Sequence, residues 1–359
     1  MAVVTIEAYP GRERLEEAEH PTISGYEIVR PLAHGGMGVV YLAWQSALER
    51  FVAIKVLRPE WREDAEVRAL FVREARALSQ VQHPHVVPVH AFGEDGPHLY
   101  LSMAYVLGET ISEALDAARR GESRVGFWFE RQSDDGRRAN VSACLVAQAI
   151  ADALDDLHSV RLVHRDVKPA NIVVDAKGRP MLVDFGLARD PDAPPIRSAG
   201  GSAGRPRYLA PELLVQDPEV DPAADIYALG LTLFEMLTLR HGFPQSDAGD
   251  LVDAIRHGDL PSARDVDPTI PRSLEAIVAR ATALDPKDRY RSARGMSAAL
   301  QAAKADLIGE VGMSTLALAP DIQRAVEDPA RGDRRRWSRA LLATLGGAAL
   351  FGAGLLAGR

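Results

Sequence analysis

The sequence predicts an α+β chain with strands in its first hundred residues, helices in the following two hundred, and a membrane-spanning helix near its C-terminal end. Short β-rich runs bounded by glycine and proline lie between residues 26 and 103, whereas residues 141–160 have the 3.6-residue apolar period of a long helix. Residues 340–358 form an uncharged run of nineteen residues. As a helix this run would be about 28 Å long at ~1.5 Å per residue, which matches the ~30 Å hydrocarbon core of a bilayer.

The composition fits a soluble domain with a substantial core, for which roughly 275 residues suffice. The formal net charge of -8 offers no case for nucleic-acid binding. Cys144 is the one cysteine, so no internal disulfide is expected and a reducing cytoplasm suits the chain. The first residues lack an apolar run, so the sequence predicts no signal peptide, and residues 1–24 are expected to form a flexible leader.

A glycine-rich turn joins the first two predicted strands, 26–32 and 39–43. Gly35, Gly36 and Gly38 in this turn lack a Cβ, so their backbone N–H groups can approach phosphate oxygens. By itself the segment fits either a phosphate cradle or an ordinary hairpin turn. Its strand–turn–strand context argues against the dinucleotide-binding fingerprint, which leads into a helix.

Lys55 lies inside the apolar, β-rich run 51–57, where a charge is costly unless it has a partner. The next segment, 65–81, has helical periodicity with acidic residues at its start, where they suit the helix dipole. Strands 86–92 and 98–103, joined by a glycine-containing turn, are then expected to form a β-hairpin.

The most informative motif is His164-Arg165-Asp166-Val167-Lys168-Pro169-Ala170-Asn171, which is followed by Asp184-Phe185-Gly186. It supplies a carboxylate that can accept a hydroxyl proton and a lysine that can neutralise a phosphate. It also supplies an amide and a second carboxylate, the hard oxygen ligands that suit Mg²⁺ better than zinc. These four residues are Asp166, Lys168, Asn171 and Asp184.

With these motifs in this order, the stretch from Tyr26 to Leu300 closely resembles the eukaryotic-type Ser/Thr protein kinases of the membrane-anchored bacterial sort. The resemblance implies the two-lobed protein kinase fold, with an antiparallel sheet and one helix in the N-lobe and a mainly helical C-lobe. It places the kinase domain at 25–303, with the N-lobe at 25–103 and the C-lobe at 107–303.

An irregular, glycine-containing segment at about 118–140 falls where the family passes quickly between two helices, so we interpret it as an insertion. It contains the aromatic residues Phe127, Trp128 and Phe129. An exposed loop that docks a partner and a loop packed back on the helical lobe both fit this trio.

The resemblance further implies ATP and Mg²⁺ as cofactors and protein serine or threonine hydroxyls as substrates. Asp166 and Lys168 are then the catalytic residues, and Asn171 and Asp184 are the metal ligands. Lysine at position 168 is typical of the Ser/Thr-directed relatives.

The resemblance assigns Lys55 to the α- and β-phosphates and pairs it with Glu74, while Met103 precedes the hinge that bonds the adenine through its backbone. Ala104 stands in this hinge where most relatives carry an acidic residue. The implied ATP-binding residues are Leu32, Ala33, His34, Gly35, Gly36, Met37, Gly38, Val40, Ala53, Lys55, Glu74, Met103, Tyr105 and Val106.

Three later motifs follow in the family's order. Glu212, in Ala210-Pro211-Glu212, closes the activation segment, and Asp225 lies in the helix that braces the catalytic loop. Arg289 is implied to pair with Glu212. These three residues are structural by the resemblance.

Two departures from the family pattern bear on activity. Ala33 replaces the first glycine of the phosphate cradle, and Arg205 replaces the usual threonine before the Tyr-x-Ala-Pro-Glu motif. For Arg205 two interpretations stay open: an ion pair that restrains Asp166, or a cation that favours acidic substrates.

Arg165 indicates a kinase whose activation segment is ordered by a phosphate. The segment has no threonine, and Ser198 and Ser202 are its only hydroxyls upstream of Arg205. They are therefore the candidate phosphorylation sites.

Arginines cluster at 331–339, before the apolar run, and only Arg359 follows it. The positive-inside rule then gives a single-pass protein of the cell membrane, with the kinase domain in the cytoplasm and 304–339 as a juxtamembrane linker. Small residues recur along 343–358 at helical spacing, which fits either a homodimer paired through this helix or a monomeric anchor. An apolar helix docked on protein is the alternative to a membrane span.

Three functional classes remain on the sequence alone. The first is an active, membrane-anchored Ser/Thr protein kinase, which is the function we predict. The second is a pseudokinase that acts as a nucleotide-binding scaffold, to which Ala33 and Arg205 point. The third, a small-molecule kinase on the same fold, is disfavoured by the complete Ala-Pro-Glu segment.

Overall fold

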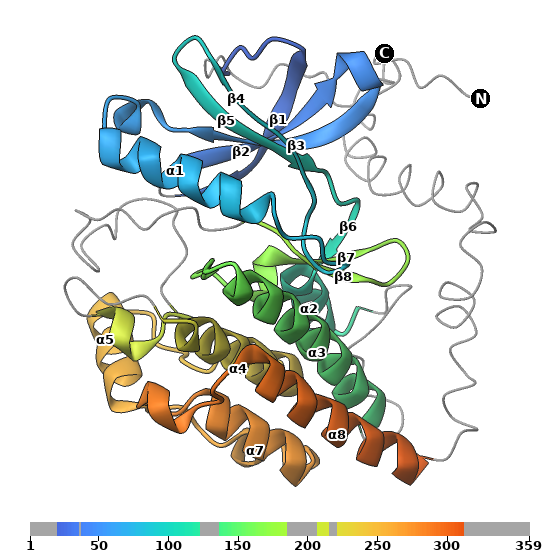
Figure 1. Ribbon diagram of the computed structural model, residues 1–359. Helices are drawn as coiled ribbons and strands as arrows, with labels where there is room; N and C mark the ends of the chain where they lie inside the picture. Colours follow the sequence, from blue (N-terminus) through green and yellow to red (C-terminus); the bar gives the residue numbers. More distant parts are fainter. Residues whose placement is uncertain (1–19, 36, 123–135, 185–206, 215–220, 312–359) are drawn as a thin grey trace, which may run out of the picture. The chain divides into compact units, whose positions relative to one another are not determined.

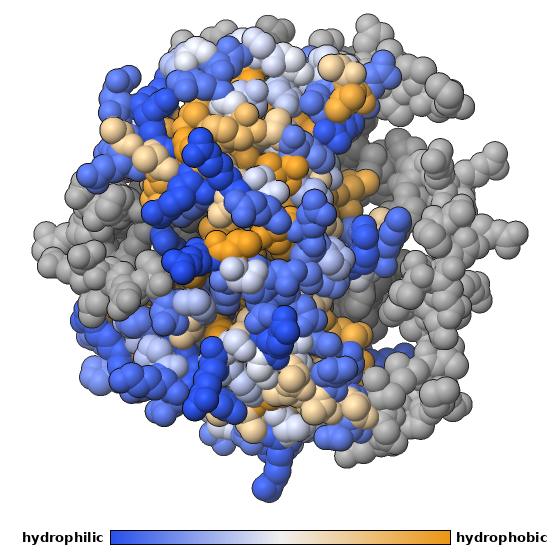
Figure 2. Space-filling model, viewed as in Figure 1, coloured by the Kyte–Doolittle hydropathy of each residue, from blue (hydrophilic) through white to orange (hydrophobic). Residues whose placement is uncertain are grey.

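A computed structural model describes residues 20–35, 37–122, 136–184, 207–214 and 221–311. These residues form the two predicted lobes, a strand-rich N-terminal lobe and a helical C-terminal lobe (Figure 1). The face drawn in Figure 2 is mainly hydrophilic, with hydrophobic patches between charged side chains, because most apolar side chains of the described residues are buried.

The N-terminal lobe is built on a five-stranded antiparallel sheet with the strand order β1-β2-β3-β5-β4. The strands are β1 (Tyr26–His34), β2 (Gly38–Gln45), β3 (Arg50–Leu57), β4 (Val89–Asp95) and β5 (His98–Ala104). Side chains alternate between the faces of a strand. Lys55 therefore shares a face of β3 with Ala53 and Leu57, which belong to the main hydrophobic core.

Helix α1 (Ala65–Leu78) packs on this face of the sheet (Figure 1). Asp64 caps it, because its side chain accepts hydrogen bonds from the backbone N–H groups of Glu66 and Val67, at 3.0 Å each. The buried residues of the helix are Val67, Phe71, Glu74, Ala75 and Leu78. The predicted helix 65–81 is thus confirmed, with its end three residues earlier.

The predicted hairpin is also present, but its first strand begins at Val89 and not at Val86. Val86 instead forms an isolated parallel bridge with Leu182 of the C-terminal lobe, and the Val87 N–H donates to the Leu182 carbonyl at 3.2 Å. The sequence could not distinguish these two partners, because both need the same extended backbone. This contact ties the segment between α1 and β4 to the strand that precedes Asp184.

The C-terminal lobe contains a small antiparallel sheet in the order β6-β7-β8 and helices α2 to α8. Its elements are β6 (Gly108–Thr110), α2 (Ile111–Arg119), α3 (Arg137–Ser159), β7 (Ile172–Asp175), β8 (Pro180–Leu182), α4 (Ala223–Thr238), α5 (Ala248–His257), α6 (Ala263–Val266), α7 (Arg272–Ala281) and α8 (Ala293–Val311). Short 3₁₀ helices at Ser46–Leu48, Pro59–Trp61, Pro169–Asn171, Pro211–Leu214 and Pro286–Asp288 join some of them.

Helix α4 is the centre of this lobe, since every one of its residues is buried. A helix that is apolar all round is expected to be covered on every side, and α4 packs between α3 and α7. The hydroxyls of Thr232 and Thr238 donate to carbonyls four residues earlier in the helix. The Thr238 hydroxyl also accepts a hydrogen bond from the Arg240 backbone N–H, at 3.1 Å, just after the helix. The two carboxylates of α4 need other partners, and both matter for the site below.

The helix predicted at 141–160 is confirmed and begins earlier, at Arg137. The last residues of the predicted insertion are therefore the first turn of α3. The aromatic trio at 127–129 lies outside the described residues.

No helix among the described residues combines the length and the hydropathy that a membrane crossing needs. Residues 1–19 of the predicted leader, the span at 340–358 and nearly all of the preceding linker lie outside the described residues. The last residues of the predicted leader, 20–24, are described, and Ile23 among them is buried and forms an isolated bridge with Tyr26.

Candidate active site

The catalytic loop is held in place by Asp225 of α4, which is fully buried. Its carboxylate accepts hydrogen bonds from the backbone N–H groups of His164, at 2.8 Å, and Arg165, at 2.7 Å. It also contacts Nε2 of His158 on α3, at 2.8 Å. Arg165 has a positive φ of 64°, a strained conformation for an arginine that persists only where surrounding contacts enforce it. Asp225 supplies those contacts, in agreement with its predicted bracing role.

His164 is buried, and burial lowers the pKa of its imidazole, so that the neutral ring is favoured. The backbone N–H of Asp166 donates to its Nδ1 at 3.3 Å. The neutral ring thus acts as a structural acceptor that orients the loop at Asp166.

The structure brings together Asp166, Lys168 and Asn171. Lys168 Nζ donates to both carboxylate oxygens of Asp166, at 2.9 and 2.7 Å. The Asn171 side-chain NH₂ donates to Oδ2 and to the backbone carbonyl of Asp166, at 2.8 Å each. Because both amide hydrogens serve Asp166, the Asn171 amide oxygen is the atom left to bind a cation.

Asp184 lies two residues after the end of β8 and forms an ion pair with Lys55, with 2.9 Å between Oδ1 and Nζ. Burial raises the pKa of Asp184, but the adjacent Lys55 ammonium outweighs this, and the pKa lies below its usual range. Asp184 is therefore a carboxylate at neutral pH, as a metal ligand must be. Its φ of 51° is also positive, a second strained residue at this site. Phe185 and Gly186 of the same motif lie outside the described residues.

The expected ion pair between Lys55 and Glu74 is not formed in this structure, where Lys55 pairs with Asp184. Glu74 is buried, and its Oε2 has no hydrogen-bond partner. Burial raises the pKa of Glu74 to about 7, although the charges of Arg165, Lys55 and Arg73 act in the opposite direction. The physical reason is competition for Lys55. Asp184 neutralises the ammonium at contact distance, so that among the described residues no cation forms an ion pair with Glu74.

Several of the residues predicted to bind ATP lie close together on the strands of the N-terminal lobe and just after β5. Val40, Ala53 and Met103 are buried in one hydrophobic cluster, and Ala53 pairs with Met103 across β3 and β5. Leu32, Ala33 and Val106 are half-buried against the same cluster. Tyr105 is half-buried at the end of β5. Met37 is buried in the core, so its side chain is a packing element of the turn.

The glycine-rich turn closes with a hydrogen bond from the Gly35 N–H to the Gly38 carbonyl, at 2.9 Å. A Cβ on Gly38 would lie 2.9 Å from the Val56 carbonyl oxygen and 3.3 Å from the Lys55 side chain. Glycine at 38 therefore lets the turn approach the strand that carries Lys55. His34 ends β1 beside this turn, and Gly36 lies outside the described residues.

Glu212 and Arg289 form the predicted pair, through two hydrogen bonds of 2.7 and 2.8 Å. Arg289 is fully buried, donates to three backbone carbonyls and stacks on the Tyr227 ring, 4.7 Å from its centroid. A buried guanidinium is stable only when its N–H groups have acceptors. Because the acceptors of Arg289 include Glu212 and the Ala223 carbonyl, Arg289 links the Pro211–Leu214 segment to α4.

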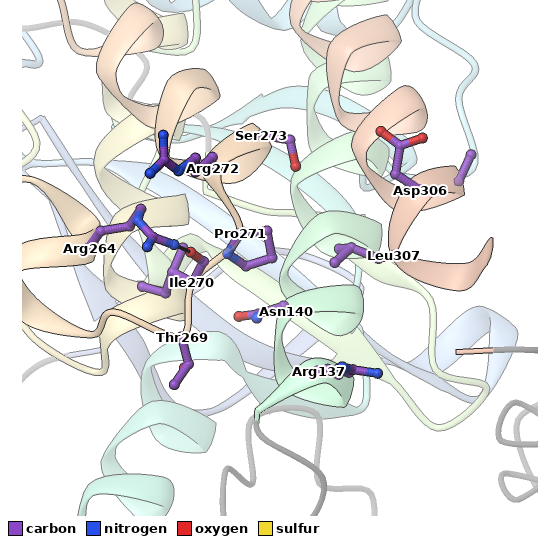
Figure 3. A pocket seen from close by; sticks show the side chains of 11 residues that line it. Arg137, Asn140, Arg264, Thr269, Ile270, Pro271, Arg272, Ser273, Asp306 and Leu307 are labelled. Carbon is purple, nitrogen blue, oxygen red and sulfur yellow. Dashed lines mark hydrogen bonds between the residues drawn. The ribbon is translucent and has the colours of Figure 1, made fainter. Parts of the chain in front are cut away.

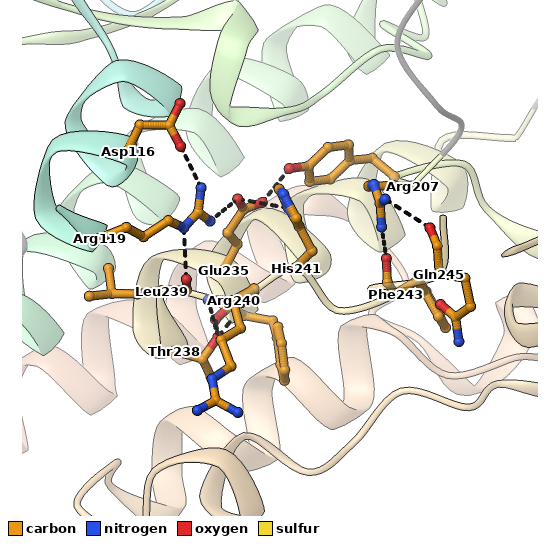
Figure 4. Close-up of polar contacts among 12 residues, drawn as sticks. Asp116, Arg119, Arg207, Glu235, Thr238, Leu239, Arg240, His241, Phe243 and Gln245 are labelled. Atoms are coloured by element: carbon orange, nitrogen blue, oxygen red, sulfur yellow. Dashed lines mark hydrogen bonds and ion pairs between the residues drawn. The ribbon is translucent and has the colours of Figure 1, made fainter. Parts of the chain in front are cut away.

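A second polar cluster was missed by the sequence analysis. Glu235, the other buried carboxylate of α4, accepts hydrogen bonds from Arg119 of α2 and from the Tyr208 hydroxyl, and lies 3.0 Å from His241 Nδ1 (Figure 4). Arg207 donates to the carbonyls of Phe243 and Gln245. These contacts fix the last residues of the activation segment, just before Ala210-Pro211-Glu212. The sequence did contain a signal for this cluster: Glu235 lies among apolar residues of α4, where a buried carboxylate needs hydrogen-bond partners.

Comparison with known proteins identifies the class. The family model described as protein kinase domain matches residues 26–302. The chain is 36% identical over 292 residues to the serine/threonine-protein kinase PrkC of Bacillus subtilis (strain 168), which covers 80% of this chain and 42% of PrkC. It is 35% identical over 281 residues to the serine/threonine-protein kinase PknH of Mycobacterium tuberculosis (strain ATCC 25618 / H37Rv), covering 78% and 42% of the two chains.

Among solved structures, the crystal structure of the Mycobacterium tuberculosis PknI kinase domain is similar, with a TM-score of 0.57 and 30% identity. The match covers 79% of this chain and 97% of that one. The chain belongs to the protein kinase family, and within it to the eukaryotic-type serine/threonine protein kinases of bacteria. A protein kinase domain uses ATP and Mg²⁺ and acts on protein substrates. The chain spans about half the length of the curated relatives it matches.

The raised pKa of buried Glu74 predicts how the stability of the protein without nucleotide depends on pH. Its folded-state pKa of about 7 exceeds its ordinary value of 4.5, so its stabilising contribution is complete below pH 4.5 and is lost as the pH rises through 7. Relative to Glu74→Gln, the wild-type free energy of unfolding should fall by roughly 2–3 kcal/mol between pH 5 and pH 8. Denaturant unfolding at both pH values measures this difference.

The matched control is Glu66→Gln, on the exposed side of the same helix. It should leave the pH dependence of unfolding as in the wild type. Parallel pH curves for the wild type and Glu74→Gln would contradict the assignment.

Proposed function

We propose that this chain is a membrane-anchored serine/threonine protein kinase that transfers the ATP γ-phosphoryl group to protein hydroxyls, with Asp166 and Lys168 as its catalytic residues. One observation carries the proposal. Two carboxylates, Asp166 and Asp184, each hold a lysine within 3 Å, and both pairs lie where the catalytic loop meets the N-terminal lobe. Phosphoryl transfer needs this combination of cations for the phosphates, oxygens for the metal and a base for the hydroxyl.

In this structure the two lysines are paired with the two carboxylates. We infer that each moves to phosphate oxygens when ATP binds, because a multiply charged triphosphate attracts an ammonium more strongly than one carboxylate does. The departure of Lys168 exposes the oxygens of Asp166, which then orient the substrate hydroxyl and accept its proton. The departure of Lys55 from Asp184 frees the metal ligand and lets Lys55 approach Glu74.

The residues present fit Mg²⁺. Both amide hydrogens of Asn171 are donated to Asp166, and no donor to its amide oxygen is found among the described residues. Asp184 is held ionised, so the two residues offer hard oxygens of the kind that Mg²⁺ prefers. Among the described residues no cluster of three or more acidic, histidine or cysteine side chains forms a metal cage. This agrees with an ion held by few protein ligands together with substrate phosphates. The ion would neutralise charge that develops on the β- and γ-phosphates.

Replacing each carboxylate separates the two roles. Asp166→Asn should lower kcat at least ~10²-fold, because the amide cannot accept the hydroxyl proton, while ATP still binds. Asp184→Asn should instead weaken Mg²⁺-dependent nucleotide binding. Transfer of labelled phosphate and equilibrium nucleotide binding measure the two effects.

Asp253→Asn, an exposed change on α5, is the control and should leave both quantities unchanged. Wild-type turnover in Asp166→Asn would refute the catalytic assignment. A wild-type chain that binds nucleotide but transfers no phosphate would favour the nucleotide-binding scaffold.

We also propose control by phosphorylation of Ser198 and Ser202, which lie outside the described residues. The support is Arg165, whose buried Nε has no hydrogen-bond partner, because a phosphate is the acceptor that satisfies an arginine fork best. Each phosphate adds about -1.5 to -2 charges. The double variant Ser198→Ala/Ser202→Ala should lose autophosphorylation in this segment and ~10-fold or more in activity, the scale of one or two charge-assisted hydrogen bonds.

Mass mapping after incubation with ATP identifies the acceptors. Ser246→Ala, an exposed serine outside the segment, should behave as the wild type. Full activity of the double variant would show that the segment is ordered without phosphate.

The membrane anchor is proposed from the apolar run 340–358 and the arginines before it. Deleting residues 334–359 should move the chain from the membrane fraction to the soluble fraction, with nucleotide binding retained. Deleting residues 2–19, a comparable length at the other end, should leave it in the membrane fraction. A C-terminally deleted chain that stays in the membrane pellet would refute the anchor.

A further inference from the structure

A cavity of about 870 Å³ lies in the C-terminal lobe, apart from the catalytic residues. Its walls are the first turn of α3, the segment 269–273 before and at the start of α7, and the end of α8 (Figure 3). None of the nucleotide or catalytic residues lines it. Its volume is within the roughly 300–1,000 Å³ that small-molecule sites occupy. The cavity has no part in phosphoryl transfer, so its chemistry has to be argued from its own lining.

Arginines dominate the charges of this lining. Arg137, Arg264 and Arg272 supply three positive charges, and Asp306 is the one carboxylate among the lining residues. Figure 3 shows Arg264 and Arg272 on one side of the cavity, with Arg137 on another side. The lining therefore carries a formal charge of +2, in a chain whose formal net charge is -8.

Two of the three arginines are available to a ligand. Arg264 is engaged, because its Nη1 donates to the Ile270 carbonyl and its Nε lies 3.8 Å from a Glu275 oxygen. Arg137 and Arg272 are exposed, and within the described part of the chain neither has a hydrogen-bond or ion-pair partner. Exposed arginines usually find a carboxylate nearby or stay in solvent. Here both border the same cavity.

The backbone adds to the positive character of the cavity. Arg137 is the first residue of α3 and Arg272 the first residue of α7, and neither helix has a side-chain hydrogen bond at its N-cap, which is Gly136 in one and Pro271 in the other. The first N–H groups of a helix have no partner within it and carry a partial positive charge. Two such helix ends border this cavity, and both have their first-turn N–H groups without a capping side chain.

We propose that this cavity is a second ligand site, which binds a phosphate-bearing anion through Arg137, Arg272 and the first-turn N–H groups of α3 and α7. Phosphate is the group that matches arginine forks and helix N-termini together, because it offers several acceptor oxygens and at least one full negative charge. A soluble phosphate compound and an anionic lipid headgroup share this chemistry.

Hydrogen–deuterium exchange of the full chain tests the proposal, with inorganic pyrophosphate as the probe. Peptides that cover 137–140 and 269–273 should exchange more slowly as pyrophosphate is added, because the proposed donors include their backbone N–H groups. This readout is specific to the cavity, so pyrophosphate at the ATP site does not disturb it. Arg137→Gln/Arg272→Gln should raise the half-saturating concentration at least 10-fold.

The matched control is Arg291→Gln, another exposed arginine. It precedes α8 at the end opposite to the cavity, about 20 Å away along the helix. It should leave the half-saturating concentration unchanged. Unchanged exchange of the α8 peptides in the double variant would confirm that both substitutions preserve the fold.

An experiment with the full chain in lipid nanodiscs distinguishes the two possible ligands, a lipid headgroup and a soluble phosphate compound. Protection of the same peptides in phosphatidylglycerol but not in phosphatidylcholine, without pyrophosphate, would identify the lipid headgroup. Protection by pyrophosphate alone would identify a soluble phosphate compound. Unprotected peptides under every condition, or equal protection in the wild type and the double variant, would overturn the proposal.

Discussion

The buried carboxylate of Asp225 is the contact on which the site depends. It is fully enclosed, accepts two backbone N–H groups of the catalytic loop and contacts His158. Burying an ionised carboxylate costs several kcal/mol unless hydrogen bonds replace water, so the loop can leave Asp225 only at a large cost. This constraint fixes the backbone of His164 and Arg165, and it places Asp166 within reach of Lys168 and Asn171. The rigidity of the catalytic loop thus comes from a residue sixty positions later in the chain.

The charges of the site are neutralised by its own residues. Lys55 pairs with Asp184 and Lys168 with Asp166, so each lysine of the site neutralises one of its carboxylates. An unpaired charge that is partly buried would be costly, and these pairs avoid that cost. Because Lys55 pairs with Asp184, Glu74 is left buried with one oxygen that has no hydrogen-bond partner, and burial raises its pKa to about 7. Under the proposed function, these are the pairs that nucleotide binding replaces.

Helix α4 unites the lobe because its polar residues are few and each has a specific partner. Asp225 holds the catalytic loop, and Glu235 joins α2 to Tyr208 and His241. Arg289 binds Glu212 and the first turn of α4 together. The catalytic loop and the end of the activation segment are thus both attached to one buried helix. The cavity bordered by Arg137 and Arg272 lies on other helices and is open to a ligand without disturbing these contacts.

Local sequence determined much of this protein, because turns, strands and helices follow from backbone preferences and periodicity. The strand–turn–strand at 26–43, the capped helix α1 and the cluster of Asp166, Lys168 and Asn171 were all predictable, since the last three lie within six residues of one another on one loop. Partner choice between distant residues was decided by tertiary structure. Whether Lys55 meets Glu74 or Asp184 depends on how closely α1 approaches β3, and whether Val86 joins β5 or Leu182 depends on how the lobes meet. The arginine-lined cavity joins segments more than a hundred residues apart, and no local pattern encodes that proximity, because packing of the whole C-terminal lobe sets it.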